Sequence, residues 1–343
     1  MGKKKKVIAF ILIMTLLVIG VTACGNSTSE AKADNTSEDG TVNLRVSYWD
    51  YNLQGNLFEF AKEWGIWDEV FTDDKVKVDL IAFENGPVAN ESITAGELDA
   101  ELSLGDQPFI TGNANGVDTS VIATTMKQEE SYITVVAADS DINSYKDLKG
   151  KSIGVGIGTF SHKSLLGILG ENGIEENEVE FTNLGESQYT EALTAIERGE
   201  LDAYFGSWYN LAAALEEGSV KQIGDSTGHP LTTYLVVTNS FIENYPDITE
   251  KLTEVLYKTI EYINENKEKA VSAIAKKLDW DEKVASEFLD KVELVADLTE
   301  EDTTSIEETQ QFLINQGVLD EEVEGLIENH TDSSFIKKVR GED

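Results

Sequence analysis

The sequence is poor in the residues that carry covalent and metal chemistry. Its 343 residues include one cysteine, three histidines and four prolines. A single thiol cannot form an intrachain disulfide, and no His/Cys/Asp cluster has metal-ligand spacing. No nucleophile–base pair can be identified from the sequence. We therefore expect no metal, no cofactor and no catalytic residue, and the low proline content argues against a proline-rich stalk.

Positive charge is also scarce. There are 27 Lys and Arg against 64 Asp and Glu, which gives a net charge of −37. So acidic a surface repels phosphate backbones, and this excludes nucleic acid as a partner. Hydrophobic residues make up 41% of the chain and aromatics 8%, enough for a packed core rather than global disorder. The length suggests about two domains.

The N-terminus has the layout of a secretory signal peptide. Lys3 to Lys6 form a basic segment, and the apolar run from Val7 to Ile19 is too short to span a bilayer comfortably. The next segment, Val21-Thr22-Ala23-Cys24, resembles the bacterial lipobox, whose cysteine is acylated. We expect a lipoprotein signal peptide at 1–23, lipidation of Cys24 and a lipid-anchored flexible tether at 24–42, which is rich in small polar residues. An uncleaved membrane anchor is the alternative.

Beyond the tether, β-type runs alternate with helical patterns. Strands are predicted at 44–49, 76–83 and 98–102, and helices at 57–64 and 88–95. This alternation is typical of an α/β fold with mostly parallel sheets. From Ser240 onward the pattern is helical throughout, with apolar residues spaced every three to four positions.

A nine-residue segment is echoed 103 positions later. Thr94 to Leu102 reads TAGELDAEL, and Glu197 to Phe205 reads ERGELDAYF. In each copy a helix precedes a glycine suited to a left-handed cap, a strand follows, and a polar turn comes next. The echo predicts two similar lobes, each presenting a strand-to-helix turn to a shared cleft, because ligands of open α/β sheets bind at the carboxyl ends of strands. A chance match of five identical residues is the alternative.

Six short motifs occur in an order that resembles the substrate-binding proteins of ABC importers for alkanesulfonates, taurine and nitrate. The resemblance covers roughly residues 44 to 320. It implies a two-lobed type II periplasmic-binding-protein fold, in which residues 43–128 and 231–343 form one lobe and 129–230 the other. The motifs are Gly86-Pro87, Ala95-Gly-Glu-Leu-Asp-Ala100, Gly105-Asp-Gln-Pro108, Asp147-Leu-Lys-Gly-Lys151, Gly158-Thr-Phe-Ser-His162 and Gly199-Glu-Leu-Asp-Ala203.

The resemblance implies an extracytoplasmic receptor that is not an enzyme. It would capture a small anionic or zwitterionic solute and deliver it to an ABC permease as a monomer, lipid-anchored on the outer face of the cell membrane of a Gram-positive bacterium. A receptor for an amine, a carboxylate or a pyrimidine-type heterocycle is one alternative. An enzyme on the same fold is another, although the related pyrimidine-precursor synthases of thiamine biosynthesis carry cysteine-rich motifs that this chain lacks.

The best candidate for anion binding is the turn containing Thr159, Phe160, Ser161 and His162. It follows a strand and begins a helix, so backbone N–H groups, hydroxyls and the positive end of the helix dipole would point at the cleft. Neutral donors matter here because the chain has only three arginines, at 45, 198 and 340. The alternative is an ordinary capped helix, and His162 either donates to the anion or is solvated.

Further candidates come from the other strand ends. Asp106 could simply cap a helix, and the aromatic residues could equally be core or interlobe packing. After the second Glu-Leu-Asp-Ala the sulfonate-type relatives usually have Trp-Asp-Pro-Tyr, whereas this chain has Gly-Ser-Trp-Tyr, which weakens the transfer of any one substrate. The remaining ligand-binding candidates are Tyr48, Trp49, Asp50, Gly105, Asp106, Gln107, Ser207 and Trp208.

Overall fold

The computed structural model describes residues 35–49, 53–72, 75–83 and 86–342. The predicted signal peptide, Cys24 and Asp50 lie outside these residues. Within the described part of the chain, no helix is both long enough and apolar enough to cross a membrane.

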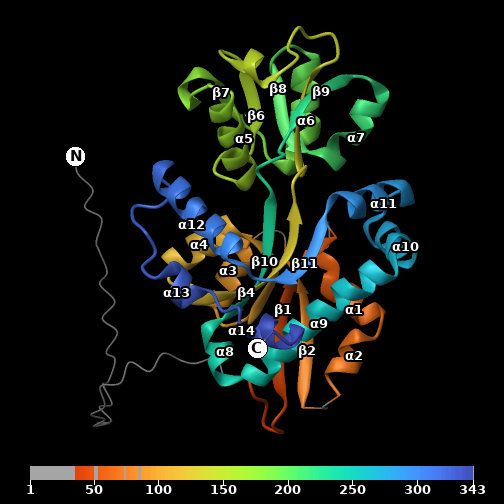
Figure 1. Cartoon of the computed structure of the whole chain (residues 1–343), viewed down its shortest axis with the longest axis vertical. Coiled ribbons are helices and arrows are strands. Elements are labelled where there is room, and N and C mark those ends of the chain that lie inside the picture. The colour runs from red at the N-terminus through yellow and green to blue at the C-terminus, as the bar shows by residue number, and fades with distance from the viewer. Residues whose placement is uncertain (1–34, 50–52, 73–74, 84–85, 343) are drawn as a thin grey trace, which may run out of the picture. The chain divides into compact units, whose positions relative to one another are not determined.

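The first lobe is built on a six-stranded sheet (Figure 1). Four strands run in one direction, and β10 and β11 run in the other. The strand order is β11-β4-β10-β3-β1-β2, with β1 at Val42–Tyr48, β2 at Val76–Ala82, β3 at Ala100–Gly105, β4 at Thr119–Gln128, β10 at Leu231–Thr238 and β11 at Glu293–Asp297.

The second lobe has a five-stranded sheet in which β5 alone of the described strands runs against the others. Both sheets are therefore mostly parallel in strand direction, which confirms the predicted α/β class. The order is β7-β6-β8-β5-β9, with β5 at Tyr132–Ala137, β6 at Ser152–Val155, β7 at Glu180–Asn183, β8 at Ala203–Ser207 and β9 at Val220–Asp225.

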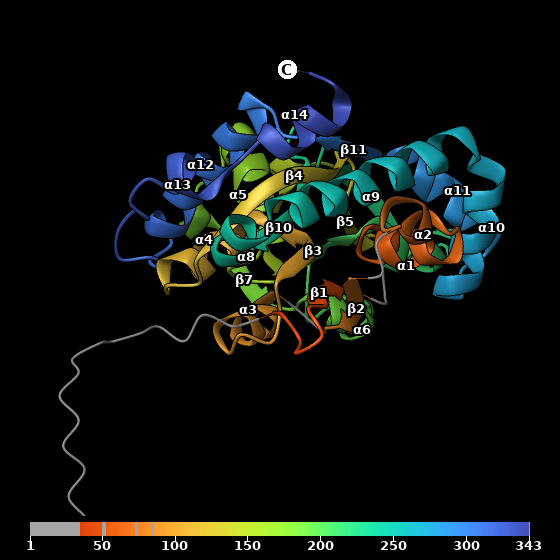
Figure 2. The same cartoon turned by 90° about the horizontal axis from the view of Figure 1, so that it is seen from below.

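Helices flank both sheets. The 20-residue helix α9 crosses the sheet of the first lobe (Figure 2), burying Leu252, Leu256 and Ile260, as their helical spacing predicts. The second lobe contains α5 (Phe160–Glu171), α6 (Tyr189–Glu197), α7 (Trp208–Glu217) and the 3-10 turns η2 (Tyr145–Leu148), η3 (Glu176–Glu178) and η4 (Glu186–Gln188). The first lobe contains η1 (Gln54–Asn56), α1 (Leu57–Glu63), α2 (Ile66–Val70), α3 (Gly86–Thr94), α4 (Asp106–Ala114), α8 (Asn239–Asn244), α9 (Pro246–Glu265), α10 (Lys267–Leu278), α11 (Glu282–Lys291), α12 (Glu300–Asn315), α13 (Leu326–His330) and α14 (Ser334–Arg340).

Two expectations from the sequence differ from the structure. The segment after Ser240 is not entirely helical, because β11 pairs antiparallel with β4. Leu294 and Ala296 are buried there and alternate with more exposed residues, which is the period-two pattern of a half-buried strand. The end of the expected tether also packs: Asn35 is buried and its Nδ2 donates to Asn43 O at 2.9 Å.

The two echoed segments, 94–102 and 197–205, adopt the same local structure in the two lobes. Gly96 and Gly199 both adopt left-handed backbone angles, with φ of 70° and 68°. Three residues later an aspartate caps the neighbouring strand. Asp99 Oδ2 accepts Arg45 N at 2.8 Å, and Asp202 Oδ2 accepts Ser152 N at 2.9 Å.

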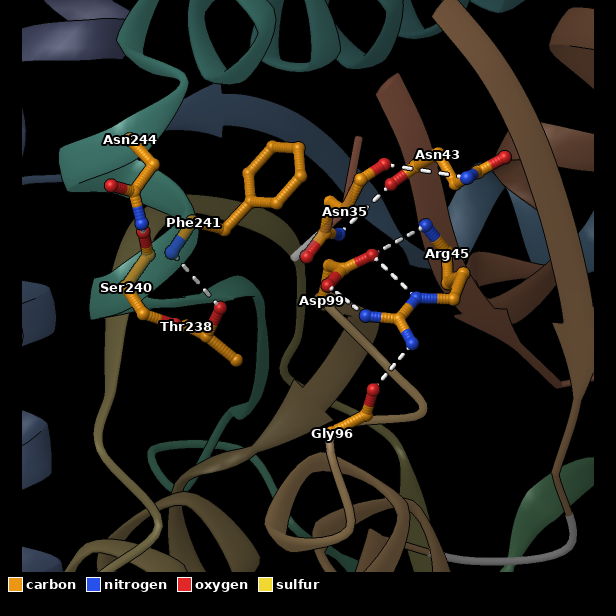
Figure 3. A network of polar contacts seen from close by, with 9 residues as sticks. All are labelled: Asn35, Asn43, Arg45, Gly96, Asp99, Thr238, Ser240, Phe241 and Asn244. Carbon is orange, nitrogen blue, oxygen red and sulfur yellow. Dashed lines mark hydrogen bonds and ion pairs between the residues drawn. The ribbon is translucent and has the colours of Figure 1, made fainter. Parts of the chain in front are cut away.

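Asp99 also binds Arg45 through its side chain (Figure 3). Arg45 Nε donates to Oδ2 at 2.9 Å and Nη2 to Oδ1 at 2.6 Å, and the guanidinium also contacts Gly96 O. This bidentate pair joins β1 to the start of β3. Arg45 therefore has a structural partner, as its place in a predicted strand suggested.

Replacing Asp99 with alanine should destabilise the protein by about 3 kcal/mol, because it leaves a half-buried guanidinium and a strand N–H without their acceptor. The matched control is Asp79→Ala. Asp79 pairs with Lys77, but these side chains are 42% and 62% exposed, so the cost should stay below about 1 kcal/mol. Urea unfolding measures both, and equal effects would contradict the role assigned to Asp99.

Candidate functional site

The chain crosses between the lobes twice, from β4 to β5 and from β9 to β10, and these crossings lie beside the carboxyl ends of β8 and β3. β5 begins at Tyr132, just after the chain leaves β4, and Tyr132 pairs with Ser207 at the end of β8. β10 begins at Leu231 on the return, and Thr233 pairs with Gly105 at the end of β3. The carboxyl ends of β3 and β8, which carry candidate residues, therefore lie next to the crossing segments.

The first-lobe edge is formed by the start of α4. Asp106 is the first residue of this helix, after the extended Gly105, and its Oδ1 accepts Gln107 N at 2.8 Å. Its Oδ2 accepts Thr309 Oγ1 of α12 and lies 3.7 Å from Lys163 Nζ of the second lobe. Asp106 thus orders the start of α4 and also joins the lobes.

Lys163 is the residue that sequence reasoning missed here. It follows directly after the Gly158–His162 motif, and its Nζ contacts both Asp106 and Thr309 Oγ1. The Gly158–His162 motif could have indicated Lys163, because a residue directly after it lies in the first turn of the helix that the motif begins. Lys163 neutralises Asp106 and brings a positive charge to the candidate site.

The start of α5 has the predicted form. Gly158 is left-handed at φ 76°, and Thr159 is the extended residue before the helix. Thr159 Oγ1 donates to Gly156 O at 2.6 Å and lies 2.8 Å from Ser161 Oγ. Because the single Thr159 hydroxyl proton is used on Gly156, Ser161 donates to Thr159. The backbone N–H groups of the first turn therefore remain available to an acceptor, and the Ser161 hydroxyl would become available if it rotated away from Thr159.

Phe160 and His162 pack beside this turn. Phe160 is half-buried, and its ring centroid lies 5.9 Å from that of Tyr132. His162 is 2% exposed, so the interpretation of a solvated histidine is wrong. Its Nδ1 accepts Gly158 N at 3.3 Å, and its ring meets Phe181 and Phe312 edge-on. Burial lowers the pKa of His162, against an opposing effect of a nearby acid, which favours the neutral ring.

Tyr48 and Trp49 lie at the end of β1. Trp49 is 4% exposed, and its Nε1 donates to Leu102 O at 2.6 Å, so this indole N–H is used within the first lobe. Tyr48 is half-buried and carries Lys277 Nζ 5.8 Å from its ring centroid. Tyr48 is therefore the more accessible of the two.

Ser207 and Trp208 begin α7. Ser207 donates through its backbone and its side chain to the carboxylate of Glu186, a residue that sequence reasoning did not select. The Trp208 ring stacks on Phe288 of α11 at 6.3 Å, with Lys291 Nζ 5.2 Å from its centroid. Trp208 also lines a cavity of about 630 Å³ between α7 and α11.

Several buried donors around these edges have no acceptor among the described residues. They are nitrogen atoms of neutral side chains, located at the start of α4, the end of β4, the start of α5 and the start of α7. Buried donors are nearly always satisfied in folded proteins, so these four are donors that a water molecule or an oxygen atom of a ligand could satisfy. The atoms are Gln107 Nε2, Gln128 Nε2, His162 Nε2 and Trp208 Nε1.

A strained serine in β3 is a second feature that the sequence did not reveal. Ser103 has φ 59°, a left-handed value that is uncommon for residues other than glycine. Its Oγ donates to Gln54 O at 2.6 Å and lies 3.2 Å from Thr125 Oγ1, which in turn lies 2.8 Å from Thr233 Oγ1. This hydroxyl chain joins η1, β3, β4 and β10 next to the crossing and fixes the end of β3 from which α4 begins.

Glu101, also in β3, is fully buried, and neither carboxylate oxygen has a hydrogen-bond partner among the described residues. Burial raises the pKa of Glu101 to about 8. The folded protein therefore holds a proton at neutral pH that the unfolded chain, with a carboxyl of ordinary pKa, does not hold.

This difference predicts a pH-dependent stability. The pKa of Glu101 is higher in the folded protein than in the unfolded chain. Its contribution to the free energy of unfolding is therefore complete below about pH 4.5 and is lost as pH rises through about 8. We expect Glu101→Gln to be more stable than the unmodified protein at pH 8.5, by up to a few kcal/mol, and much closer to it at pH 5. Urea unfolding at both pH values tests this, and parallel curves would show that Glu101 titrates normally.

Comparison with known proteins identifies the family. The family described as NMT1/THI5 like matches residues 69–270, more than half of the chain, and the protein belongs to it. A protein of Bacillus subtilis (strain 168), provisionally named an aliphatic sulfonates-binding protein, is 27% identical over 282 residues, covering 81% of this chain and 83% of the relative. The taurine-binding periplasmic protein of Escherichia coli (strain K12) is 29% identical over 196 residues, 56% of each chain.

Solved structures show the same fold. The periplasmic aliphatic sulphonate binding protein SsuA from Escherichia coli has a TM-score of 0.70 at 21% identity, covering 82% of this chain and 89% of that one. The predicted two-lobed periplasmic-binding-protein fold is thereby confirmed. The desulfurization enzyme DSZB shares the fold too: a C27S mutant in complex with biphenyl-2-sulfinic acid has a TM-score of 0.68 at 16% identity, covering 88% and 99%.

Proposed function

We propose that the protein is the extracytoplasmic solute-binding component of an ABC importer. Its solute is a small anion or zwitterion of the aliphatic sulfonate, taurine or nitrate type, which it delivers to the membrane permease. Relatives named as sulfonate- and taurine-binding proteins support this class of solute. We further propose that it acts as a monomer, lipid-anchored through Cys24 on the outer face of the cell membrane of a Gram-positive bacterium.

The observation that carries the proposal is the set of buried neutral donors at the strand ends of both lobes. Gln107 Nε2 and Gln128 Nε2 belong to the first lobe and its crossing, and Trp208 Nε1 to the second. A ligand that supplies several oxygens between these edges would satisfy donors from both lobes together, which is how binding can favour lobe closure. A sulfonate supplies three such oxygens.

Electrostatics explains why neutral donors matter in this protein. Two of the three arginines have acidic partners, since Arg45 pairs with Asp99 and Arg340 with Glu342, and Arg198 is exposed at the end of α6. The first turn of α5 supplies backbone donors with the helix dipole behind them, and Lys163 reduces the local excess of negative charge. The site therefore suits one anionic group rather than a multiply charged ligand.

We assign the site residues as follows. Backbone groups of Phe160, Ser161 and His162 bind the anion, with Thr159 holding the turn and Gln107 approaching from the first lobe. Tyr48, Asp50, Ser207 and Trp208 border the solute, Gly105 and Asp106 shape the start of α4, and Trp49 supports that edge from within the first lobe. The lobes comprise 43–128 with 231–343, and 129–230, following the two sheets.

An enzyme is the second candidate class, and the specific observation in its favour is the shared fold of DSZB. A receptor differs from an enzyme in releasing its ligand unchanged. A receptor for an amine, a carboxylate or a heterocycle differs only in which ligand binds.

Calorimetry on the chain from residue 25 onward tests the proposal with taurine, a short alkanesulfonate, nitrate, a quaternary amine and a methylpyrimidine. We expect micromolar or tighter binding of a sulfonate, with the ligand recovered unchanged by mass spectrometry. Binding of only the amine or the pyrimidine would overturn the anion assignment, and a converted ligand would favour the enzyme.

The double variant Thr159→Ala/Ser161→Ala tests the anion site at α5. Loss of the Ser161 donor and of the Thr159 bond that holds the turn should weaken an anionic ligand by about 1–3 kcal/mol. Thr194→Ala is the matched control, because this half-buried threonine lies on α6 in the same lobe and its hydroxyl donates to Thr190 O of the same helix. Unchanged affinity in the double variant would place the anion elsewhere.

A further inference from the structure

Three strand ends of the second lobe meet around the start of α5. β7, β6 and β8 are parallel neighbours, so their carboxyl ends lie at one edge. Glu186 follows β7, Thr159 follows β6, and Ser207 is the last residue of β8. The backbone is close there: a Cβ added at Gly156 would lie 3.1 Å from Thr159 Oγ1 and 3.4 Å from Gly185 Cα. Glu186 is therefore adjacent to the proposed anion site.

The carboxylate of Glu186 lies against the start of α7. It accepts hydrogen bonds from the backbone and side chain of Ser207 and from Asn210 Nδ2 at 3.2 Å. A negative group of the protein therefore already lies at the start of α7, where Ser207 was expected to bind ligand. Of the two helix starts at this edge, α5 is the one that can receive an anion.

Glu186 is half-buried and lacks a positive partner among the described residues. Burial raises its pKa, and the opposing effects come only from Ser207 and Asn210. Within the described chain, no lysine, arginine or histidine is recorded in an ion pair with it. Burial, followed by the charge of Glu186 itself, raises the pKa of Tyr132 and Tyr204, so two phenols also border this carboxylate.

A half-buried carboxylate without a counter-charge is costly unless a cation approaches it. In a receptor that binds an anion at the adjacent turn, the ligand can supply that cation. We propose that Glu186 is the specificity-determining residue of the site and recognises the ammonium end of a zwitterionic solute whose anionic end lies on the start of α5.

This inference rests on the proposed function, because it needs a solute at α5. Asp106 is not the carboxylate that binds the ammonium group, because it is paired with Lys163 and Thr309. A simple alkanesulfonate would leave Glu186 uncompensated and would itself be repelled by it, so the site should prefer an aminosulfonate.

Calorimetry with Glu186→Gln tests this, since Gln keeps an oxygen that can accept from Ser207 and Asn210. The probes are taurine, 1-propanesulfonate, in which a methyl group replaces the ammonium, and β-alanine, in which a carboxylate replaces the sulfonate. The unmodified protein should prefer taurine to 1-propanesulfonate at least tenfold. In Glu186→Gln, taurine binding should weaken tenfold or more, while 1-propanesulfonate should bind as well as before or better. Glu191→Gln, which removes an exposed charge from α6 in the same lobe, should change neither.

The outcomes separate the two proposals. Equal changes for taurine and 1-propanesulfonate in Glu186→Gln, or no change, would overturn the role of Glu186 and leave the sulfonate receptor intact. Binding of β-alanine alone, lost in Glu186→Gln, would overturn the sulfonate assignment and support Glu186. Absence of binding to all three probes would overturn both. Thermal unfolding of each variant confirms that a lost affinity is not a lost fold.

Discussion

The site depends on two strands that run antiparallel to both of their neighbours and lie next to the crossings, β10 in the first lobe and β5 in the second. β5 enters the second lobe from β4, and β10 enters the first lobe on the return. Each pairs with the strand whose carboxyl end begins a candidate helix, namely β8 and β3. The crossing segments therefore lie beside the ends of β3 and β8 in both sheets. Without these two pairings, the helix starts at Asp106 and Trp208 would have no fixed relation to each other.

The second constraint is electrostatic. A protein with a net charge of −37 opposes the approach of an anion at long range. At short range, fixed dipoles and neutral N–H groups can still bind one anionic group, because they are organised before the ligand arrives and need no charge of their own. Lys163 reduces the negative charge near this site by pairing with Asp106. A solute that also carries a positive charge meets less resistance from the acidic surface than a simple anion does.

Local patterns predicted much of the fold. The alternation around β1 and β2 and the helical spacing along α9 gave the right element types, and the Gly-Glu-Leu-Asp-Ala echo marked two equivalent strands. β11 was missed because its alternating pattern covers five residues beside long helical segments. The echo suggested a functional role for its surroundings, but its aspartates turn out to hold strands together.

The candidate site was less predictable, because its partners are distant in sequence. The Gly158–His162 turn could be found from a strand followed by small polar residues and a helix. The pairing of Lys163 with Asp106 and Thr309, and the contacts of Glu186 with Ser207 and Asn210, depend on how whole elements pack. No spacing in the sequence encodes them. Likewise, the left-handed backbone at Ser103 follows from the end of β3 and not from its residue type.

Hydrogen–deuterium exchange with and without a bound sulfonate or aminosulfonate tests the central claim most directly. If one solute joins the strand ends of both lobes, the amides at the starts of α4, α5 and α7 should all become protected on binding, because closure removes them from water. Protection should be strongest at 159–163. Binding that protects only one lobe, or that leaves 159–163 unchanged, would contradict the site described above.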